Sequence, residues 1–173
     1  PPHETPPVHF DELIATRAID WIQEQRATSP NKPFFTYYAT GTAHTPHHAP
    51  KQWLDKFKGR FDQGWDAARE ETFTRQKQLK VIPEDARLTP RPKELPAWDE
   101  LSKLQKSVAS RLMEAYAASL AHADAQIGRV IDALRDMGEI ENTLVIFIQG
   151  DNGGSAEGGF NGQLFSQSML NGF

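Results

Sequence analysis

Two stretches of the chain carry apolar side chains at helical spacing. In the first, one stripe contains Leu13, Ile14, Ala18, Trp21 and Ile22. This spacing predicts a helix over residues 10–26. Asp11 and Glu12 suit the positive end of the dipole of that helix.

A longer amphipathic pattern follows in the second half of the chain. Its apolar positions are Leu104, Val108, Leu112, Tyr116, Leu120, Ile127, Val130, Ile131 and Leu134. The recurrence predicts one long helix, which Gly138 can end. Residues 59–98 are charged, aromatic and proline-punctuated without a clear period, so we expect a long excursion there, with one helix near residues 67–79.

Two short runs are rich in apolar and aromatic residues without a helical period. Residues 34–39 read FFTYYA and residues 144–148 read LVIFI, and turn residues bound both runs. The second run is typical of a strand covered on both faces. Helices alternating with buried strands predict an α/β fold with a mostly parallel sheet flanked by helices, and such sheets bind ligands beyond the carboxyl ends of their strands.

Composition restricts the classes of function. A chain of 173 residues with 38% apolar content can form one domain with a sizeable core. Its net charge of -4 argues against a nucleic-acid partner. The chain has no cysteine, which excludes disulfides, thiolate metal sites and a cysteine nucleophile within it. The longest apolar run, residues 144–148, is too short to span a membrane.

An acid and an amide follow the second predicted strand, in the sequence QGDNGGSAEGG. Oxygens of Asp151 and Asn152 suit a hard cation such as Ca²⁺ or Mg²⁺, and Gly150, Gly153 and Gly154 let the backbone approach a ligand closely. Two residues cannot complete the coordination shell. Asp-Asn-Gly-Gly is also ordinary turn chemistry, so the turn and the cation site both remain open on composition alone.

Three histidines follow the first predicted strand. His44, His47 and His48 lie in a loop with no carboxylate or thiol beside them, which disfavours zinc. An imidazole at a strand end can instead donate to an anionic substrate or protonate a leaving oxygen. The alternative is a proline-rich surface loop whose histidines face water. His122, in the long helix, is interpreted as a packed or surface histidine rather than a ligand.

Several of these segments together resemble a known family. FFTYYATGTAHTPHHAP, the long helix, LVIFIQGDNGGSAEGG and FKGRFDQGWDAAREETFTRQ are similar to the middle of a type I sulfatase of the alkaline-phosphatase-like superfamily, close to the bacterial arylsulfatases. The resemblance covers residues 10–161. It implies that residues 1–173 are an internal portion of one catalytic domain, whose partners are the remaining N- and C-terminal parts of that domain.

The resemblance also implies roles for particular residues. Sulfatases hold one divalent cation, usually Ca²⁺, with two early aspartates and an Asp-Asn pair that Asp151 and Asn152 match. A family histidine in an H-x-P loop contacts the sulfate ester and is implicated in protonating its leaving oxygen. His44 fits this pattern, although Ala43 precedes it where a proline is commoner. His47 and His48 then become bystanders or rim contacts.

The family nucleophile is a formylglycine made in a C-x-P-S-R or S-x-P-S-R motif, and this motif does not occur in the chain. The resemblance therefore implies a sulfuric ester hydrolase whose formylglycine lies outside this fragment, a small-molecule sulfate ester as substrate, and an inactive fragment. It favours a periplasmic or secreted location. Two alternatives remain, namely a phosphonate or phosphate monoester hydrolase of the same superfamily and a non-catalytic module that binds sulfated ligands.

Overall fold

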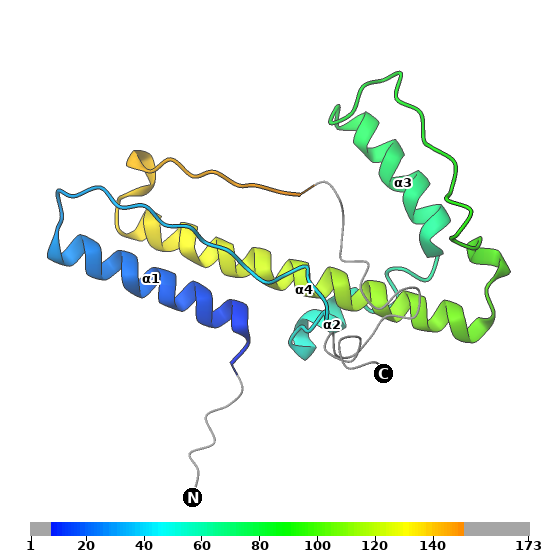
Figure 1. Cartoon of the computed structure of the whole chain (residues 1–173), viewed down its shortest axis with the longest axis horizontal. Helices are drawn as coiled ribbons and strands as arrows, with labels where there is room; N and C mark the ends of the chain where they lie inside the picture. Colours follow the sequence, from blue (N-terminus) through cyan, green and yellow to red (C-terminus); the bar gives the residue numbers. More distant parts are fainter. Residues whose placement is uncertain (1–7, 151–173) are drawn as a thin grey trace, which may run out of the picture.

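The computed structural model describes residues 8–150, in which the regular secondary structure consists of helices (Figure 1). The elements of this part are α1 (Phe10–Thr28), α2 (Lys51–Phe57), α3 (Gly64–Gln78), the 3-10 helix η1 (Trp98–Glu100), α4 (Lys103–Asp136) and the 3-10 helix η2 (Ile140–Asn142). The two helices predicted from periodicity are confirmed as α1 and α4, and the helix expected near residues 67–79 is confirmed as α3, whereas α2 was not predicted. None of the described helices combines the length and apolarity needed to cross a membrane.

The core lies between α1 and the C-terminal part of α4, which run side by side (Figure 1). Its buried members are Ala15, Ile22, Val130 and Leu134. Phe34 and Tyr38, from the segment after α1, pack against the same cluster. Burial of these apolar side chains, each contributing about 1.5–3 kcal/mol when large, holds the two helices together.

The sequence sets both ends of α4. Ser102 and Gln105 form a capping box, in which Ser102 Oγ accepts the Gln105 N–H (3.3 Å) and Gln105 Oε1 accepts the Ser102 N–H (2.9 Å). At the other end Gly138 has φ 72°, and its N–H donates to the Arg135 carbonyl (2.9 Å). The prediction that Gly138 ends this helix is confirmed.

Most buried residues of α4 form a row of every fourth residue, and Ser119 and Ala123 are buried beside it. The row contains Ser110, Glu114, Ala118, His122, Gln126, Val130 and Leu134. Such a row winds slowly around a helix, so different neighbours cover its successive parts. The apolar row that the sequence suggested begins on another side, where Leu104 and Val108 are exposed. The extent of the helix was therefore predicted correctly, but its buried face was predicted correctly only near the C-terminus, where Val130 and Leu134 are buried.

The predicted mostly parallel α/β sheet is wrong, because residues 8–150 contain no strand. A strand needs a neighbour to pair its N–H and C=O groups. Residues 34–40 run as an extended trace over the helices (Figure 1), with alternate side chains turned inward and Phe35 and Tyr37 85% and 81% exposed. Leu144 and Ile148 are 85% and 84% exposed, so burial of residues 144–148 on both faces is also wrong for this structure.

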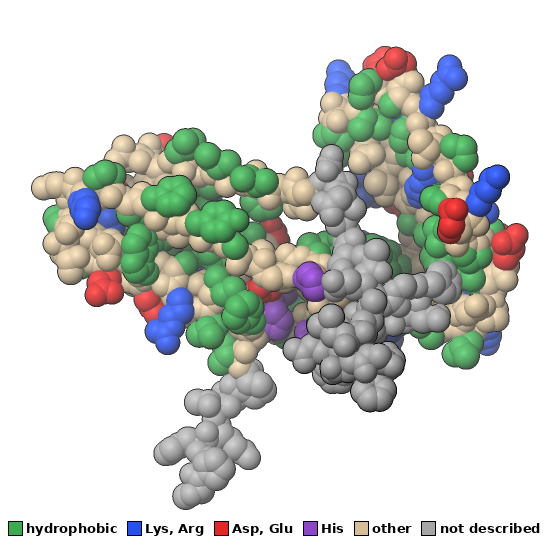
Figure 2. Space-filling model, viewed as in Figure 1, with side chains coloured by type: hydrophobic (Ala, Val, Ile, Leu, Met, Phe, Trp, Pro, Cys, Tyr) green, Lys and Arg blue, Asp and Glu red, His purple; other side chains and the backbone are tan. Residues whose placement is uncertain are grey.

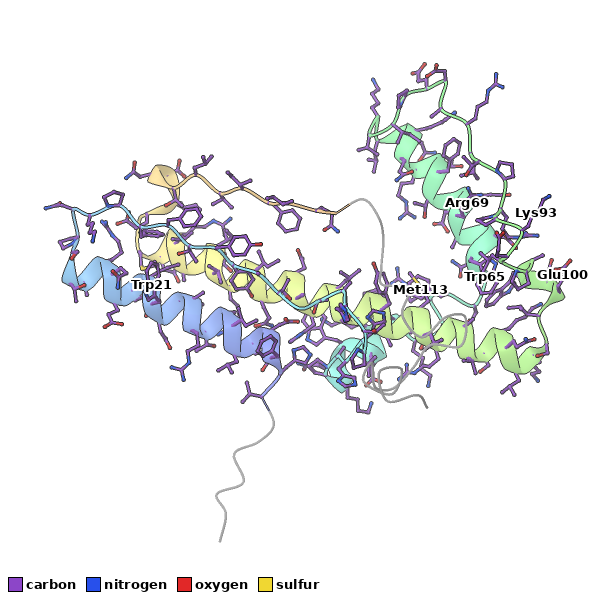
Figure 3. The ribbon with its side chains drawn as sticks, viewed as in Figure 1. Trp21, Trp65, Arg69, Lys93, Glu100 and Met113 are labelled. Carbon is purple, nitrogen blue, oxygen red and sulfur yellow. The ribbon has the colours of Figure 1, made fainter. Side chains whose placement is uncertain are left out.

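The α3 arm, residues 59–101, projects from the N-terminal part of α4 (Figure 1). Trp65 lies at the base of α3 (Figure 3), and its ring meets the Trp98 ring edge-to-face at 4.9 Å. Asp66 Oδ2 accepts the Trp98 N–H (2.8 Å), and Asp66 Oδ1 accepts from Arg91 (3.0 Å). These contacts join the start of α3 to residues 91–98 near the end of the arm. Trp98 and Leu101 are the buried apolar residues of the arm.

Candidate functional site

The loop of residues 40–48 is tied to the start of α1 by a buried carboxylate. Asp11, only 2% exposed, accepts one hydrogen bond from the Thr40 hydroxyl at Oδ1 and one from the Thr42 hydroxyl at Oδ2, both 2.7 Å. The Thr42 N–H donates to Thr40 Oγ1 (3.1 Å). Hydrogen bonds to a charged group are worth about 1.5–3 kcal/mol each. Asp11 therefore fixes the conformation of this loop in addition to lying at the positive end of α1.

His44 lies on this loop with its side chain exposed. Its backbone N–H donates to the Gly41 carbonyl (2.9 Å), and its ring Nδ1 lies 2.7 Å from the Thr45 carbonyl. A carbonyl oxygen can only accept, so Nδ1 carries the hydrogen of the neutral ring and Nε2 carries its lone pair. The tied loop thus holds the imidazole in one orientation.

A cavity of about 230 Å³ lies beside this histidine. Its lining residues are His9, Phe10, Asp11, Gly41, Thr42, His44, Thr45, Pro46, His47, His48 and Ser119. Histidine side chains gather in the middle of the face in Figure 2. The cavity therefore combines imidazoles, hydroxyls and one carboxylate from α1, α4 and the loop of residues 40–48.

His47 is half-buried beside the cavity, with one ring nitrogen buried in the protein. Its Nδ1 is buried without a hydrogen-bond partner among the described residues, and its ring meets Tyr116 of α4 at 5.1 Å. Burial lowers the pKa of His47, and the nearby charge of His44 lowers that pKa further. His47 is therefore held neutral near pH 7 and acts as a packing side chain.

A second group of titratable side chains lies at one end of the cavity. One ring nitrogen each from His9 and His122 and one oxygen of Asp11 all lie within 4.8 Å of one another. His122 is fully buried, and its Nε2 lies 3.0 Å from Glu12 Oε1. This set of two imidazoles and a carboxylate could hold a metal ion.

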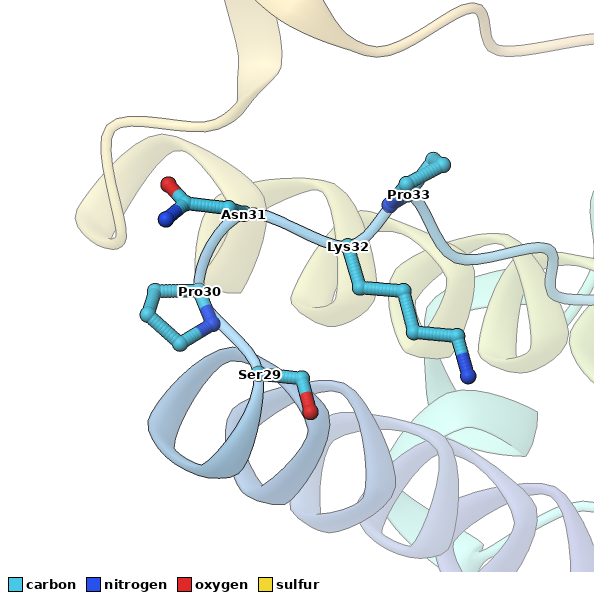
Figure 4. Close-up of a pocket in the computed structure, with 5 residues that line it drawn as sticks. All are labelled: Ser29, Pro30, Asn31, Lys32 and Pro33. Carbon is cyan, nitrogen blue, oxygen red and sulfur yellow. The ribbon is translucent and has the colours of Figure 1, made fainter.

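A larger hollow of about 470 Å³ lies elsewhere, at the turn after α1 (Figure 4). Five consecutive residues line it, from Ser29 to Pro33. It is an open turn in which Lys32 is the only ionisable side chain. Its chemistry offers no reacting group, so the smaller cavity beside His44 is the candidate site.

Comparison with known proteins decides the family. A family model described as sulfatase matches residues 1–172, almost the whole chain. The chain belongs to the sulfatase family. The resemblance seen in the sequence is thereby confirmed.

Individual sulfatases are similar over most of the chain. An uncharacterized sulfatase of Schizosaccharomyces pombe is 39% identical over 153 residues, which are 87% of this chain and 26% of the relative. An arylsulfatase of Klebsiella aerogenes is 34% identical over 154 residues, 88% of this chain and 32% of the relative. An arylsulfatase of Clostridium perfringens is 26% identical over 146 residues, 82% of this chain and 26% of the relative. The chain spans about a quarter to a third of these relatives.

The predicted sulfatase site is only partly within the described residues. His44 lies on the tied loop beside the cavity. Asp151 and Asn152 lie outside residues 8–150, so the convergence of this pair with His44 stays a prediction.

The sequence interpretation missed the cluster on which this sulfatase loop rests. Asp11 was assigned to the helix dipole, His122 was interpreted as a packed or surface histidine rather than a ligand, and His9 received no role. His122 is indeed packed, as its full burial confirms. The available signal was His9 and Asp11 two residues apart at a helix start, together with two threonines just before His44.

Proposed function

We propose that this chain is part of a sulfuric ester hydrolase of the arylsulfatase type, in which His44 protonates the leaving oxygen of a sulfate monoester. The observation that carries the proposal is the orientation of His44, exposed beside a cavity of about 230 Å³ on a loop fixed by Asp11. Membership in the sulfatase family supplies the reaction class.

The hydrogen bond of His44 assigns the proton that moves. Since Nδ1 donates to the Thr45 carbonyl, the proton delivered to the alcohol or phenol oxygen comes from Nε2. A general acid of this kind contributes about 10²- to 10⁴-fold to the rate. Rigid attachment of the loop keeps the imidazole within reach of the leaving oxygen.

The rest of the site follows from the family. Asp151 and Asn152 would hold a cation through oxygen ligands of the kind that Ca²⁺ takes, with Mg²⁺ less well suited, and this cation would neutralise charge on the sulfate oxygens. A formylglycine outside this chain would supply the nucleophile. The isolated 173-residue chain is therefore expected to be inactive.

Substrate comparison on the complete protein tests the proposal. We expect hydrolysis of an aryl sulfate with higher kcat/KM than that of the matching phosphate and phosphonate monoesters. A large preference for the phosphonate would assign the protein to the phosphonate hydrolases of the same superfamily. Binding of a sulfated ligand without turnover would instead indicate a non-catalytic module.

A variant of the cation pair provides an independent measurement. The melting temperature of the complete protein is expected to rise with added Ca²⁺, and Asp151→Ala is expected to remove this rise. The matched control is Asp124→Ala, which changes an exposed carboxylate on α4. An equal Ca²⁺ shift in Asp151→Ala and in the parent protein would remove Asp151 from the cation site.

A further inference from the structure

We propose that His9, Asp11 and His122 form a binding site for a divalent transition-metal ion, with Zn²⁺ as the best-suited ion. The site brings together the start of α1 and the middle of α4, 110 residues apart in the chain where Glu12 meets His122. It does not depend on the sulfatase mechanism proposed above.

The three side chains are already close. One potential ligand atom from each lies within 4.8 Å of the other two, and the centroids of the two imidazole rings are 4.3 Å apart. Asp11 and His122 are buried, whereas His9 lies at the edge of the cavity with 20% of its side chain exposed. An ion could therefore enter from the cavity and reach two ligands that are already fixed.

His122 is oriented as in known metal sites. Its Nε2 lies 3.0 Å from the Glu12 carboxylate, which can only accept, so Nε2 carries the hydrogen. The Gln126 amide nitrogen, 3.3 Å from the same atom, can only donate, so it makes no hydrogen bond with Nε2 in this tautomer, and the shorter contact with the carboxylate sets the position of the hydrogen. The lone pair of the neutral ring is then on Nδ1. A histidine that donates one N–H to a carboxylate and binds metal through its other nitrogen is a recurrent arrangement in metalloproteins.

The Nδ1 atom of His122 is the observation that a purely structural role leaves unexplained. It is buried and has no hydrogen-bond partner among the described residues, although His122 is fully buried. A buried polar atom without a partner costs about 1–3 kcal/mol. A metal ion would use this lone pair, whereas ordinary helix packing would not.

The second imidazole has a comparable arrangement. His9 Nε2 lies 3.2 Å from the His48 carbonyl, to which it donates, so the lone pair of the neutral ring is on Nδ1. That nitrogen accepts the Asp11 N–H at 3.3 Å and lies 3.8 Å from Asp11 Oδ2. The contact with the backbone is long, so a metal ion could replace it at little cost.

Asp11 completes the ligand set. Its two oxygens accept the hydroxyls of Thr40 and Thr42, which hold the carboxylate in place and leave each oxygen a further lone pair. Ligating carboxylates are commonly supported by hydrogen bonds of this kind. The threonines thus connect the proposed metal site to the loop that carries His44.

The ligand chemistry favours Zn²⁺ over Ca²⁺. Two imidazoles and one carboxylate match the nitrogen-rich sites of Zn²⁺, whereas Ca²⁺ takes six to eight oxygens. Zn²⁺ bonds of about 2.0–2.1 Å in a tetrahedron place ligand atoms about 3.4 Å apart, so the cluster must contract by up to about 1.4 Å. The part-exposed His9 can supply that movement, and water from the cavity can supply a fourth ligand.

Cobalt absorption tests the proposal directly. The complete protein, freed of metal by chelation and reloaded with excess Ca²⁺, is titrated with Co²⁺. We expect one equivalent of Co²⁺ to give visible bands of a tetrahedral site, and one equivalent of Zn²⁺ to abolish them. Ca²⁺ in excess should not compete.

Matched variants identify the ligands. His9→Asn keeps a side chain that can cap α1 but lacks the imidazole, and His122→Gln keeps a donor for Glu12. Each is expected to weaken Co²⁺ binding by at least tenfold, and Glu12→Gln, which alters only the support of His122, by about 10- to 100-fold. His48→Asn, a change to a neighbouring exposed histidine outside the cluster, should leave binding unchanged.

Circular dichroism and the melting temperature of each variant confirm that it is folded. Absence of tetrahedral bands in the folded parent protein would overturn the proposal. Equal Co²⁺ affinity in the parent, His9→Asn and His122→Gln would do the same, and would leave His122 as a packed histidine. Both results are independent of whether the protein hydrolyses sulfate esters.

Discussion

The two ends of α4 are held by different kinds of contact. Near its C-terminus, α4 packs on α1 through Val130, Leu134 and their apolar neighbours. Near its N-terminus, it meets the base of the α3 arm through polar groups, where Glu114 accepts the Gly59 N–H (2.7 Å) and Ser110 donates to the Phe61 carbonyl (3.3 Å). The arm itself is closed by the contact of Trp65 with Trp98.

This difference divides the molecule into a helical body that contains the candidate site and an arm that does not. The helical body, comprising α1, α2, the loop of residues 40–48 and the part of α4 after Ser110, contains the cavity and its histidines. The α3 arm contributes no residue to that cavity. We therefore expect substitutions in the α3 arm to lower the stability of the protein, and loss of His44 from the loop of residues 40–48 to lower turnover.

The largest effect is expected from His44→Ala in the complete protein. Loss of the proposed general acid should lower kcat for an aryl sulfate by about 10²- to 10⁴-fold, with little change in the melting temperature because the side chain is exposed. Steady-state kinetics and thermal unfolding measure the two quantities. His48→Ala is the control on the same loop. Wild-type turnover in His44→Ala would remove this residue from the mechanism.

Gly64→Ala should destabilise the α3 arm. Gly64 has φ 81°, and an added Cβ would lie 2.1 Å from Cδ2 of the Trp98 ring. Strain and overpacking together predict a loss of about 2–5 kcal/mol in the free energy of unfolding of the arm. Hydrogen exchange should show faster opening of α3 than of α1.

The control for this substitution is Gly128→Ala, on α4. An added Cβ there would meet nothing within 4 Å, and Gly128 is helical, so a gain of about 0.4–1 kcal/mol is expected. Equal exchange rates for α3 and α1 in Gly64→Ala would contradict the division into body and arm.

Removal of the carboxylate that ties the loop should have an intermediate effect. Asp11→Ala leaves the hydroxyls of Thr40 and Thr42 without their acceptor, for a predicted cost of about 1–3 kcal/mol. A double-mutant cycle with Thr40→Val measures the contact, and we expect a coupling of about 1 kcal/mol. Strictly additive effects would show that the hydrogen bond does not stabilise the loop.

The smallest effect is expected at the contact between the helical body and the α3 arm, where Glu114 accepts the Gly59 N–H. Burial by itself raises the pKa of the Glu114 carboxyl, but hydrogen bonds from Arg111 and the Gly59 N–H outweigh burial, so its pKa lies below the ordinary value of 4.5. A carboxyl with a lowered folded-state pKa stabilises the protein above its unfolded-state pKa. This stability is lost as the pH falls below 4.5 and through the folded-state pKa.

Melting temperatures of the parent protein and of Glu114→Gln between about pH 7 and about pH 3 measure this contribution. The parent protein should be the more stable near neutral pH, and the difference should shrink on acidification. A difference that stays constant across this range would show that Glu114 does not titrate as proposed.

Local sequence signals were sufficient for the helices. Periodicity predicted α1 and α4, and Gly138 marked the end of α4, because these features depend on neighbours only a few residues apart. The same reasoning failed for residues 34–39 and 144–148. Their β-prone composition predicted paired strands, yet pairing depends on a partner elsewhere, and the described residues provide none.

By itself the sequence determined the family and the presence of α1, α3 and α4, because motifs, periodicity and composition are properties of short segments. It also identified His44 as a candidate acid, which stays a prediction. Only the tertiary structure showed which side of α4 is buried and that His9, Asp11 and His122 meet, since these contacts join segments about 110 residues apart. A histidine at a helix start and another in the middle of a distant helix carry no signal of each other until packing brings the two helices together.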